Sequence, residues 1–508
     1  MKKIILPILM LICCINMFAQ LTCELPMSKV EIDEEIPLDF IPELFTDDVW
    51  ASPTILGDRR VFFVHGLGGQ GDEDGTVGIS WSQASLWSQT EYKINASRPD
   101  YADVSLSIAA AELKDDLEGI PGSGSNAIFI GHSQGGIVGR RIDYSYYTGE
   151  WGPEPRSFGG LVTFGSSHQG ARVLNNKEDL TAWSGTTCEA LTKGYINETI
   201  ESNFYLDLLL NATTIDGFQD FFCDAIENNI APFIFKDYYS GITESYEVGS
   251  EQLQELNEFT PEIPYVCFYG VETEPVMWNT LVHTIDGHEP NNVVTYGEEP
   301  FGCGNDESLK NWADMMTDQY YLKYSAYGAL ADMYEDLIYG FDFPTIPCYI
   351  IFLCAINATN SYEEVSQLSE DFKLGYDWFV DANATWKGFI GALEFTETDL
   401  ICTCIDDGPL GDLEEVTYIA SPDGECITED YDTDCYLTQY YGYITKESDG
   451  VVLKESASEC LGQVLLPDYK RRMEESNHFS MRNDFNTELK LTSLFEGGCG
   501  LYFYTALR

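Results

Sequence analysis

Residues 126–136 read Asn-Ala-Ile-Phe-Ile-Gly-His-Ser-Gln-Gly-Gly, and this stretch decides the fold. Its first half, residues 126–130, is a short apolar run with β-branched and aromatic side chains, which predicts a buried strand. The motif G-x-S-x-G follows at once, and residues 137–142 can begin a helix. A strand, this motif and a helix in that order predict a nucleophile elbow, a strained turn that holds Ser133 over the N-terminal end of the helix.

The motif alone is weak evidence for a catalytic serine. At this length and glycine content, chance supplies about 0.3 G-x-S-x-G matches per chain, so the surrounding structure has to carry the assignment. The strand before the motif and the helix after it provide part of that support. The rest has to come from an oxyanion loop, a general base and an acid elsewhere in the chain.

An apolar run at residues 60–64 leads into a glycine-rich loop at residues 65–69, which reads His-Gly-Leu-Gly-Gly. An oxyanion hole requires such a loop after a buried strand, because glycines let the backbone turn its amides toward the site. We expect the backbone N–H groups of Leu67 and Gln134 to bind the oxyanion. The other residues of the two loops that we expect to support the site, without shuttling protons, are His65, Gly66, Gly68 and His132.

A third apolar run, residues 160–164, is followed by residues 165–171, which read Gly-Ser-Ser-His-Gln-Gly-Ala. Strands and helices alternate up to this point. That alternation predicts the α/β class, with a mostly parallel sheet and helices on both of its faces. Ligands bind such sheets beyond the carboxyl ends of the strands, so the site is expected there.

The general base has to be one of six histidines: His65, His132, His168, His283, His288 or His478. Chains with a nucleophile elbow carry the serine, the acid and the histidine in that order, which favours a late histidine. His478 is the expected base, because it lies in a polar loop, residues 476–483, before a final helical stretch. His168 closes a strand beside that of the serine and is expected to be structural.

The acid should precede the histidine on a loop, and Asp449 in residues 448–452 fits this position. Asp-Gly is also a common dipeptide in plain turns, so the sequence of the loop is weak evidence by itself. Asp286, Asp423 and Asp432 are the alternatives.

The N-terminus has the pattern of a secretory signal peptide over residues 1–19. A basic start is followed by an apolar run that is too short for a membrane span, and a small residue stands at the cleavage position. A signal anchor is the alternative. No other run of 18 or more apolar residues occurs, so a secreted or periplasmic protein without a stable membrane span is expected.

The cysteine count fits an oxidising compartment. Removal of the signal peptide takes two of the 15 cysteines and leaves 13, an odd number, so we expect disulfides and at least one unpaired thiol. Close pairs such as Cys402/Cys404 and Cys426/Cys435 lie in a polar segment, which we expect to be an irregular loop held by disulfides. No C-x-x-C motif occurs and the histidines do not cluster beside the cysteines, so no metal site is expected.

The chain is strongly acidic, with a formal net charge of −57 and a pI near 4.1. Such a surface disfavours nucleic acids and anionic membranes as partners and favours solubility in salt. The charge by itself implies no particular partner.

The motifs together resemble the α/β-hydrolase superfamily, in particular secreted bacterial triacylglycerol lipases and the related GPI inositol-deacylase-like esterases. Residues 64–69 resemble the family's oxyanion loop, and residues 131–136 resemble its elbow. Residues 162–170 are similar to its third core block, with Ser-Ser at 166–167 where the family usually has Thr-Pro. Residues 448–452 look like its catalytic-acid loop, and residues 477–478 look like its histidine loop.

The resemblance implies a Ser133–His478–Asp449 triad in a secreted serine hydrolase that cleaves carboxylic esters of the lipid type through an acyl-enzyme. It implies no cofactor. Calcium-binding lipases of this kind carry an aspartate two residues after the histidine; Ser480 stands there, so a structural calcium of that type is not expected. The alternatives are a non-catalytic binding or adhesion module with the same fold, and an acyltransferase, amidase or polyester depolymerase that uses the same triad.

The predicted organisation has two large insertions in one core, and the oligomeric state is left open. Residues 176–260 are expected to form a lid or a cap subdomain, through which the protein makes transient contact with a lipid interface. Residues 286–439 are expected to be helical at first and then a disulfide-rich loop. Two apolar stripes at helical spacing are expected to face the core: Leu322, Ala326, Ala329, Leu330, Met333 and Leu337, and Val365, Leu368, Phe372 and Phe379. The predicted segments are a signal peptide (1–19), an N-terminal lead-in (20–57), the first core part (58–175), the first insertion (176–260), a core strand (261–285), the second insertion (286–439) and the C-terminal core with Asp449 and His478 (440–508).

Overall fold

The computed structural model describes residues 59–67, 80–183, 186–187, 193, 240–280, 307–339, 348–407, 413–419, 434–460 and 466–505. The predicted signal peptide and lead-in, residues 1–57, lie outside these residues, as does most of the predicted first insertion. Among the described helices, none is both long enough and apolar enough to cross a lipid bilayer.

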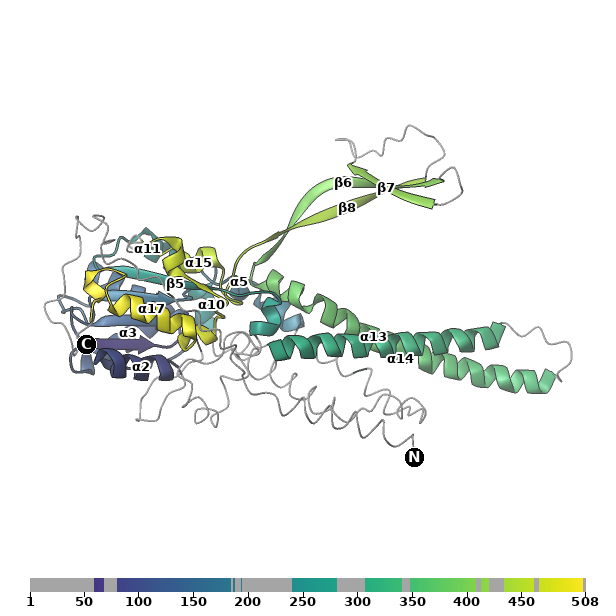
Figure 1. Ribbon diagram of the computed structural model, residues 1–508, viewed down its shortest axis with the longest axis horizontal. Coiled ribbons are helices and arrows are strands. Elements are labelled where there is room, and N and C mark those ends of the chain that lie inside the picture. The colour runs from purple at the N-terminus through teal and green to yellow at the C-terminus, as the bar shows by residue number, and fades with distance from the viewer. Residues whose placement is uncertain are drawn as a thin grey trace, which may run out of the picture.

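A six-stranded sheet forms the centre of the molecule, and every neighbouring pair of its strands is parallel (Figure 1). Parallel strands buried on both faces read as continuous apolar runs, which is why the runs at 60–64, 126–130 and 160–164 predict strands. In spatial order the strands are β2 (Asn95–Ser97), β1 (Arg60–Val64), β3 (Ile128–His132), β4 (Gly160–Phe164), β5 (Tyr265–Val271) and β9 (Arg472–Glu474).

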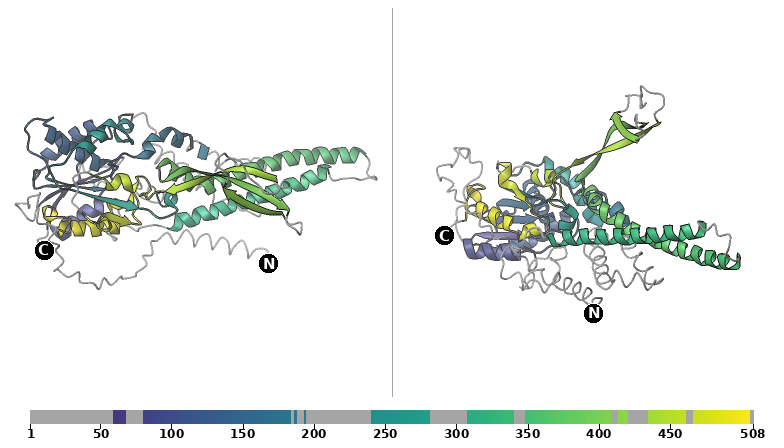
Figure 2. Two further views of the ribbon diagram at one scale, coloured as in Figure 1. Left: turned by 90° about the horizontal axis from the view of Figure 1, so that it is seen from above. Right: turned by 45° about the vertical axis from the view of Figure 1, so that its right-hand side comes forward.

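The two-residue period of the strands divides the core into two layers. On β1, Phe62 and Val64 pack in the cluster under the helices α3 (Leu106–Gly119), α4 (Gln134–Thr148), α10 (Ser240–Tyr246) and α11 (Glu251–Glu258). Val61 and Phe63 pack on the opposite face, under α2 (Ser82–Tyr92) and α17 (Phe485–Phe495). Figure 2 shows these helices on the two sides of the sheet. The predicted architecture is confirmed: the chain has an α/β-hydrolase fold.

The remaining short elements connect the sheet and its helices. They are α5 (Arg172–Asn175), α15 (Lys454–Ser458), α16 (Asp468–Arg471), η6 (Ser480–Arg482) and η7 (Leu501–Phe503).

Two long helices, α13 (Glu307–Tyr339) and α14 (Cys348–Phe389), pack side by side and project from the sheet domain (Figure 1). Helices were predicted in both places, and the stripe Val365, Leu368, Phe372 and Phe379 of α14 is buried as expected. In α13 the predicted stripe is buried only in part: Leu322 is 57% exposed, whereas Leu330 packs against the core. Among the α13 side chains that the structure describes, the buried ones are Met316, Tyr320, Lys323, Tyr327 and Ala331, and the rings of Tyr320 and Tyr327 contact Phe372 of α14.

A second projection is a three-stranded antiparallel sheet in the order β7-β6-β8, made of β6 (Leu393–Asp407), β7 (Leu413–Ile419) and β8 (Asp434–Thr445) (Figure 1). The prediction of an irregular loop between residues 402 and 435 is therefore wrong over the described strands. The β-branched and aromatic residues in these runs favour extended pairing, and this preference outweighs the polar composition. β8 also extends to Thr445, beyond the residue at which the C-terminal core was expected to begin.

Candidate active site

Ser133 occupies the turn between β3 and α4 with φ 51° and ψ −123°, a backbone conformation that is strained for a residue with a side chain. Two of the surrounding glycines are required because other backbone atoms lie too close to them to leave room for a side chain. A Cβ on Gly131 would lie 2.5 Å from the backbone nitrogen of Gly136, and one on Gly135 would lie 2.2 Å from the carbonyl oxygen of His65. The elbow predicted from the motif is therefore present, with Ser133 at its apex.

Three of the predicted site residues meet in a line of hydrogen bonds. Ser133 Oγ lies 2.9 Å from His478 Nε2, and His478 Nδ1 lies 2.8 Å from Asp449 Oδ2. The carboxylate can only accept, so Nδ1 carries the ring proton and Nε2 is left to accept from the serine hydroxyl. Asp449 and His478 are 1% and 4% exposed, which shields this arrangement from bulk water.

The Asp449 loop fixes the carboxylate in this position. Asp449 Oδ1 accepts hydrogen bonds from the backbone N–H groups of Val451 and Val452, at 3.1 and 2.7 Å. The backbone N–H of His478 donates to the carbonyl of Asp449 at 2.7 Å, which joins the two loops directly. The alternative acids Asp286, Asp423 and Asp432 lie outside the described residues.

Buried polar groups hold the loop that carries His478. Asp484 caps α17 by accepting from the backbone N–H of Thr487 at 2.8 Å, and it also accepts from the hydroxyl of Ser476. Burial raises the pKa of the Asp484 carboxyl. Asn477 donates to the hydroxyl of Thr280 at 3.1 Å. These bonds hold the backbone on either side of His478.

The predicted oxyanion loop packs directly against the elbow. A Cβ on Gly66 would lie 2.8 Å from the Cβ of Ser133, so only glycine allows this approach. Leu67 and Gln134 line the same cavity as Ser133. Their role as oxyanion donors stays a prediction, and Gly68 lies outside the described residues.

His65 and His132 are each hydrogen-bonded to backbone or side-chain groups of neighbouring loops. His65 bonds the carbonyl of Gly66 through Nδ1 at 2.8 Å and Asp100 through Nε2 at 2.7 Å. His132 Nε2 donates to the carbonyl of His478 at 2.7 Å. Burial, followed by the charges of His478 and Arg482, lowers the pKa of His132 well below its ordinary value, so its ring is neutral at neutral pH.

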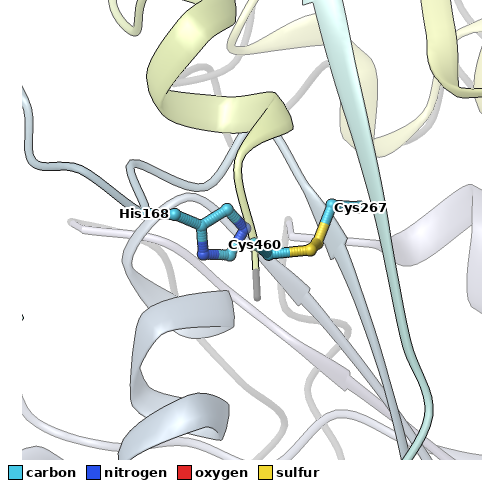
Figure 3. A group of neighbouring side chains, drawn as sticks. All are labelled: His168, Cys267 and Cys460. Atoms are coloured by element: carbon cyan, nitrogen blue, oxygen red, sulfur yellow. A yellow bond between two sulfur atoms is a disulfide. The ribbon is translucent and has the colours of Figure 1, made fainter. Parts of the chain in front are cut away.

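His168 is structural, and it lies beside the disulfide between Cys267 of β5 and Cys460 (Figure 3). Its Nδ1 accepts from Arg140 Nη1 at 3.2 Å, and its Nε2 donates to the hydroxyl of Thr163 at 3.0 Å. Both sulfurs are engaged in the disulfide and both ring nitrogens in hydrogen bonds, so this group offers no free ligand atom to a metal. His283 and His288 lie outside the described residues.

Ser133 lines a cavity of about 120 Å³. Most of its wall is apolar and comes from α5, α10, α14 and the Asp449 loop; the residues are Val173, Leu174, Ile242, Tyr246, Trp386, Val451 and Val452. Ser133, His478 and Arg482 belong to its polar part. Such a cavity can hold a chain of carbon atoms with a polar group at the serine.

Sequence reasoning missed Trp386 and Arg482. Trp386 donates its indole N–H to the carbonyl of Gly450 at 2.9 Å, which ties the end of α14 to the loop of Asp449. A signal was available, since Trp386 continues the stripe Val365, Phe372 and Phe379 at intervals of seven residues. Arg482 has no such signal, because it follows His478 on an irregular loop.

Comparison with known proteins gives only distant likenesses. No family model matches the chain, and no curated protein matches it. Among solved structures, the chain is similar to an extracellular alpha/beta-hydrolase from a Paenibacillus species, with 12% identity, 41% of this chain and 76% of that chain covered, and a TM-score of 0.22.

Two further solved structures show likenesses of the same order. Phospholipase PlaB from Legionella pneumophila has 13% identity, with 45% of this chain and 43% of that chain covered, and a TM-score of 0.25. EstA from Clostridium botulinum has 15% identity, with 45% and 64% covered, and a TM-score of 0.25. This chain thus spans less than two thirds of the length of either protein, and likeness at this level assigns no function.

Proposed function

We propose that this protein is a serine hydrolase that cleaves carboxylic esters with an apolar acyl chain. The observation that carries the proposal is the unbroken line of hydrogen bonds from Ser133 Oγ through His478 to Asp449, beside a mostly apolar cavity that Ser133 and His478 line. A binding module that only retained the fold would have no need to keep Ser133 on a strained turn with His478 and Asp449 aligned to it.

In the proposed reaction His478 Nε2 takes the hydroxyl proton of Ser133 while Oγ attacks the ester carbonyl. Asp449 holds the ring in the required tautomer and stabilises the imidazolium. The tetrahedral intermediate collapses by breaking the bond to the alcohol oxygen, which receives the proton from His478. Water, deprotonated by His478, then attacks the acyl-enzyme and releases the carboxylic acid, so that ester and water give acid and alcohol.

The oxyanion of the intermediate would be bound by the backbone N–H groups of Leu67 and Gln134. Gln134 is the first residue of α4, so its N–H belongs to the positive end of the helix dipole. A donor of this type contributes a factor of about 10²–10³ to kcat.

Export through residues 1–19 is part of the same proposal and rests on the sequence of that segment alone.

The test is labelling by a fluorophosphonate probe together with an ester panel of increasing acyl length. We expect the probe to label Ser133, and Ser133→Ala to lose both labelling and turnover while its circular dichroism is unchanged. Ser107→Ala on α3 is the matched control and should behave as wild type. Turnover that persists in Ser133→Ala would sink the proposal, and a wild type that neither labels nor turns over would favour the binding module.

Acyl transfer to a second molecule is separated from hydrolysis in the same assay. Adding a primary alcohol or amine as acceptor and analysing the products by mass spectrometry shows whether the acyl group passes to water. We expect the free carboxylic acid as the main product.

A further inference from the structure

Arg482 contributes the one Arg or Lys side chain among the described residues that line the cavity at Ser133. It stands at the end of η6, four residues after His478, and is half-buried. Its Nε donates to the carbonyl of Phe479 at 3.1 Å, and its Nη1 donates to the hydroxyl of Ser80 at 3.2 Å. Both acceptors are neutral, and they fix the guanidinium against the histidine loop.

No carboxylate of the described residues forms an ion pair with Arg482, and no Asp or Glu is among the described lining residues of the cavity. Some other arginines of the chain are paired with acids, whereas the buried Arg59 and Arg140 bond only neutral acceptors among the described residues. Arg472 contacts Glu447 and Glu474, and Arg156 contacts Asp143 and Glu262. Arg482 differs from Arg59 and Arg140 in its place, because it lines the cavity at Ser133 and has no ion-pair partner among the described residues.

The guanidinium keeps its charge in this place. Burial lowers the pKa of Arg482 to about 10, which still leaves it protonated at neutral pH. A cation withdrawn from water without a counter-charge is destabilising, and an anion that enters the cavity removes that penalty. The planar fork of arginine also suits carboxylate and phosphate oxygens.

The position of Arg482 decides which part of an ester it meets. His478 must reach the leaving oxygen in order to protonate it, so the alcohol part of the ester lies against the histidine loop. Arg482 and Phe479 belong to that loop. The apolar residues Val173, Leu174 and Ile242 come from α5 and α10 and are left for the acyl chain.

We infer that Arg482 selects esters whose alcohol part carries an anionic group, either a carboxylate or a phosphate. The inference rests on the proposed function and narrows its substrate class. Arg482 then acts as a specificity-determining residue: it binds the anion, while Ser133, His478 and Asp449 perform the reaction.

The experiment compares esters that differ in one charge. The probes are 3-butyryloxybenzoate, its neutral isostere 3-butyryloxybenzamide, and 3-butyryloxyphenyl phosphate, each followed by acylation of Ser133 in the mass spectrum and by release of the phenol. For wild type we expect kcat/KM to be about 10- to 100-fold higher for an anionic probe than for the amide, the range of one charge-assisted hydrogen bond. The benzoate and the phosphate arms show which anion is preferred.

The variant Arg482→Gln should reduce this preference to about 1, through loss of activity on the anionic probes, while activity on the amide changes less than about 3-fold. Arg482→Lys should keep part of the preference. Arg141→Gln, which removes a half-buried charge paired with Glu150 and away from the cavity lining, is the matched control and should leave the preference unchanged.

The outcomes separate the two proposals. Equal rates on the charged and neutral probes in wild type, or an equal loss on both in Arg482→Gln, would show that Arg482 only braces the loop, with the serine hydrolase proposal intact. Failure of all three probes and of the fluorophosphonate to modify Ser133 would overturn the proposed function, and the inference on Arg482 with it.

Discussion

His168 is held as a neutral imidazole by its two hydrogen bonds. Arg140 donates to Nδ1. A proton on Nδ1 would break this bond and place a positively charged imidazole beside the guanidinium of Arg140. Burial and the charge of Arg140 accordingly lower the pKa of His168 well below 6.5. His132 has the same direction of shift for the same main reason, burial.

These two histidines predict a loss of stability in mild acid. In the unfolded chain a histidine binds its proton near pH 6.5, whereas in the folded chain His132 and His168 do not. Their contribution is therefore complete above about pH 6.5 and is lost as the pH falls toward the lowered folded-state pKa, at about 1.4 kcal/mol per pH unit for each histidine. Urea denaturation between pH 7.5 and 5.0 measures this slope in the free energy of unfolding.

The matched variant for this measurement is His168→Gln. Glutamine can accept from Arg140 and donate to Thr163 but does not titrate. The free energy of unfolding of the variant should therefore depend less steeply on pH, by about 1.4 kcal/mol per pH unit, which corresponds to one proton. This comparison also cancels the buried carboxyls Glu272 and Asp484, whose raised pKa values act in the opposite direction in both proteins. Parallel curves for wild type and variant would contradict the assignment.

At the scale of the elements, the sequence predicted those strands and helices whose patterns are strong. β3, β4 and β5 are buried throughout and β1 is buried after Arg60, and all four read as apolar runs. β9, with the sequence Arg-Met-Glu, has no such pattern, because it pairs along one edge only and over three residues. The strands β6 to β8 were missed because acidic and hydroxyl side chains masked their extended preference.

The residues of the candidate site also differ in whether a sequence pattern predicts them. Ser133, Asp449 and His478 were predictable because the elbow needs glycines at fixed places and the fold sets the order of the other two. Trp386 could have been predicted to be buried, because it continues the stripe of α14, but its contact with the Asp449 loop could not. The place of Arg482 in the cavity could not be predicted either, because it depends on how an irregular loop packs against the core.

The disulfide between Cys267 and Cys460 joins β5 to the segment that follows α15, across 193 residues that include both projections. Closing so long a loop restricts the unfolded chain strongly. We expect Cys267→Ala combined with Cys460→Ala to lower the free energy of unfolding by about 2–5 kcal/mol, measured by urea denaturation without reductant.

Cys499→Ala is the control for this variant. Cys499 is buried and has no disulfide partner, so the substitution removes a thiol without removing a cross-link. We expect it to cost less than about 2 kcal/mol, because only a small buried group is lost. If the double variant were no less stable than Cys499→Ala, the cross-link would not be a source of stability.

At the scale of the whole molecule, the projecting helices are fastened to the site. At the core end of α14, Trp386 bonds the carbonyl of Gly450, Asn383 accepts from the backbone N–H of Met277, and Lys387 pairs with Glu274. The segment between β5 and β9 therefore supplies both a wall of the cavity and a brace for the Asp449 loop. Its removal would expose the site as well as shorten the chain.

The charge of −57 acts on the whole molecule by self-repulsion, which favours the unfolded chain because its charges lie farther apart. Salt screens this repulsion, and the Debye length falls from about 30 Å at 0.01 M to about 8 Å at 0.15 M. We therefore expect the Tm at pH 7.5 to rise as NaCl increases over this range, and KCl to act equally, since screening depends on ionic strength. A Tm that falls would mean that ion pairs such as Arg472–Glu447 contribute more to stability than the repulsion removes, because the same salt weakens them.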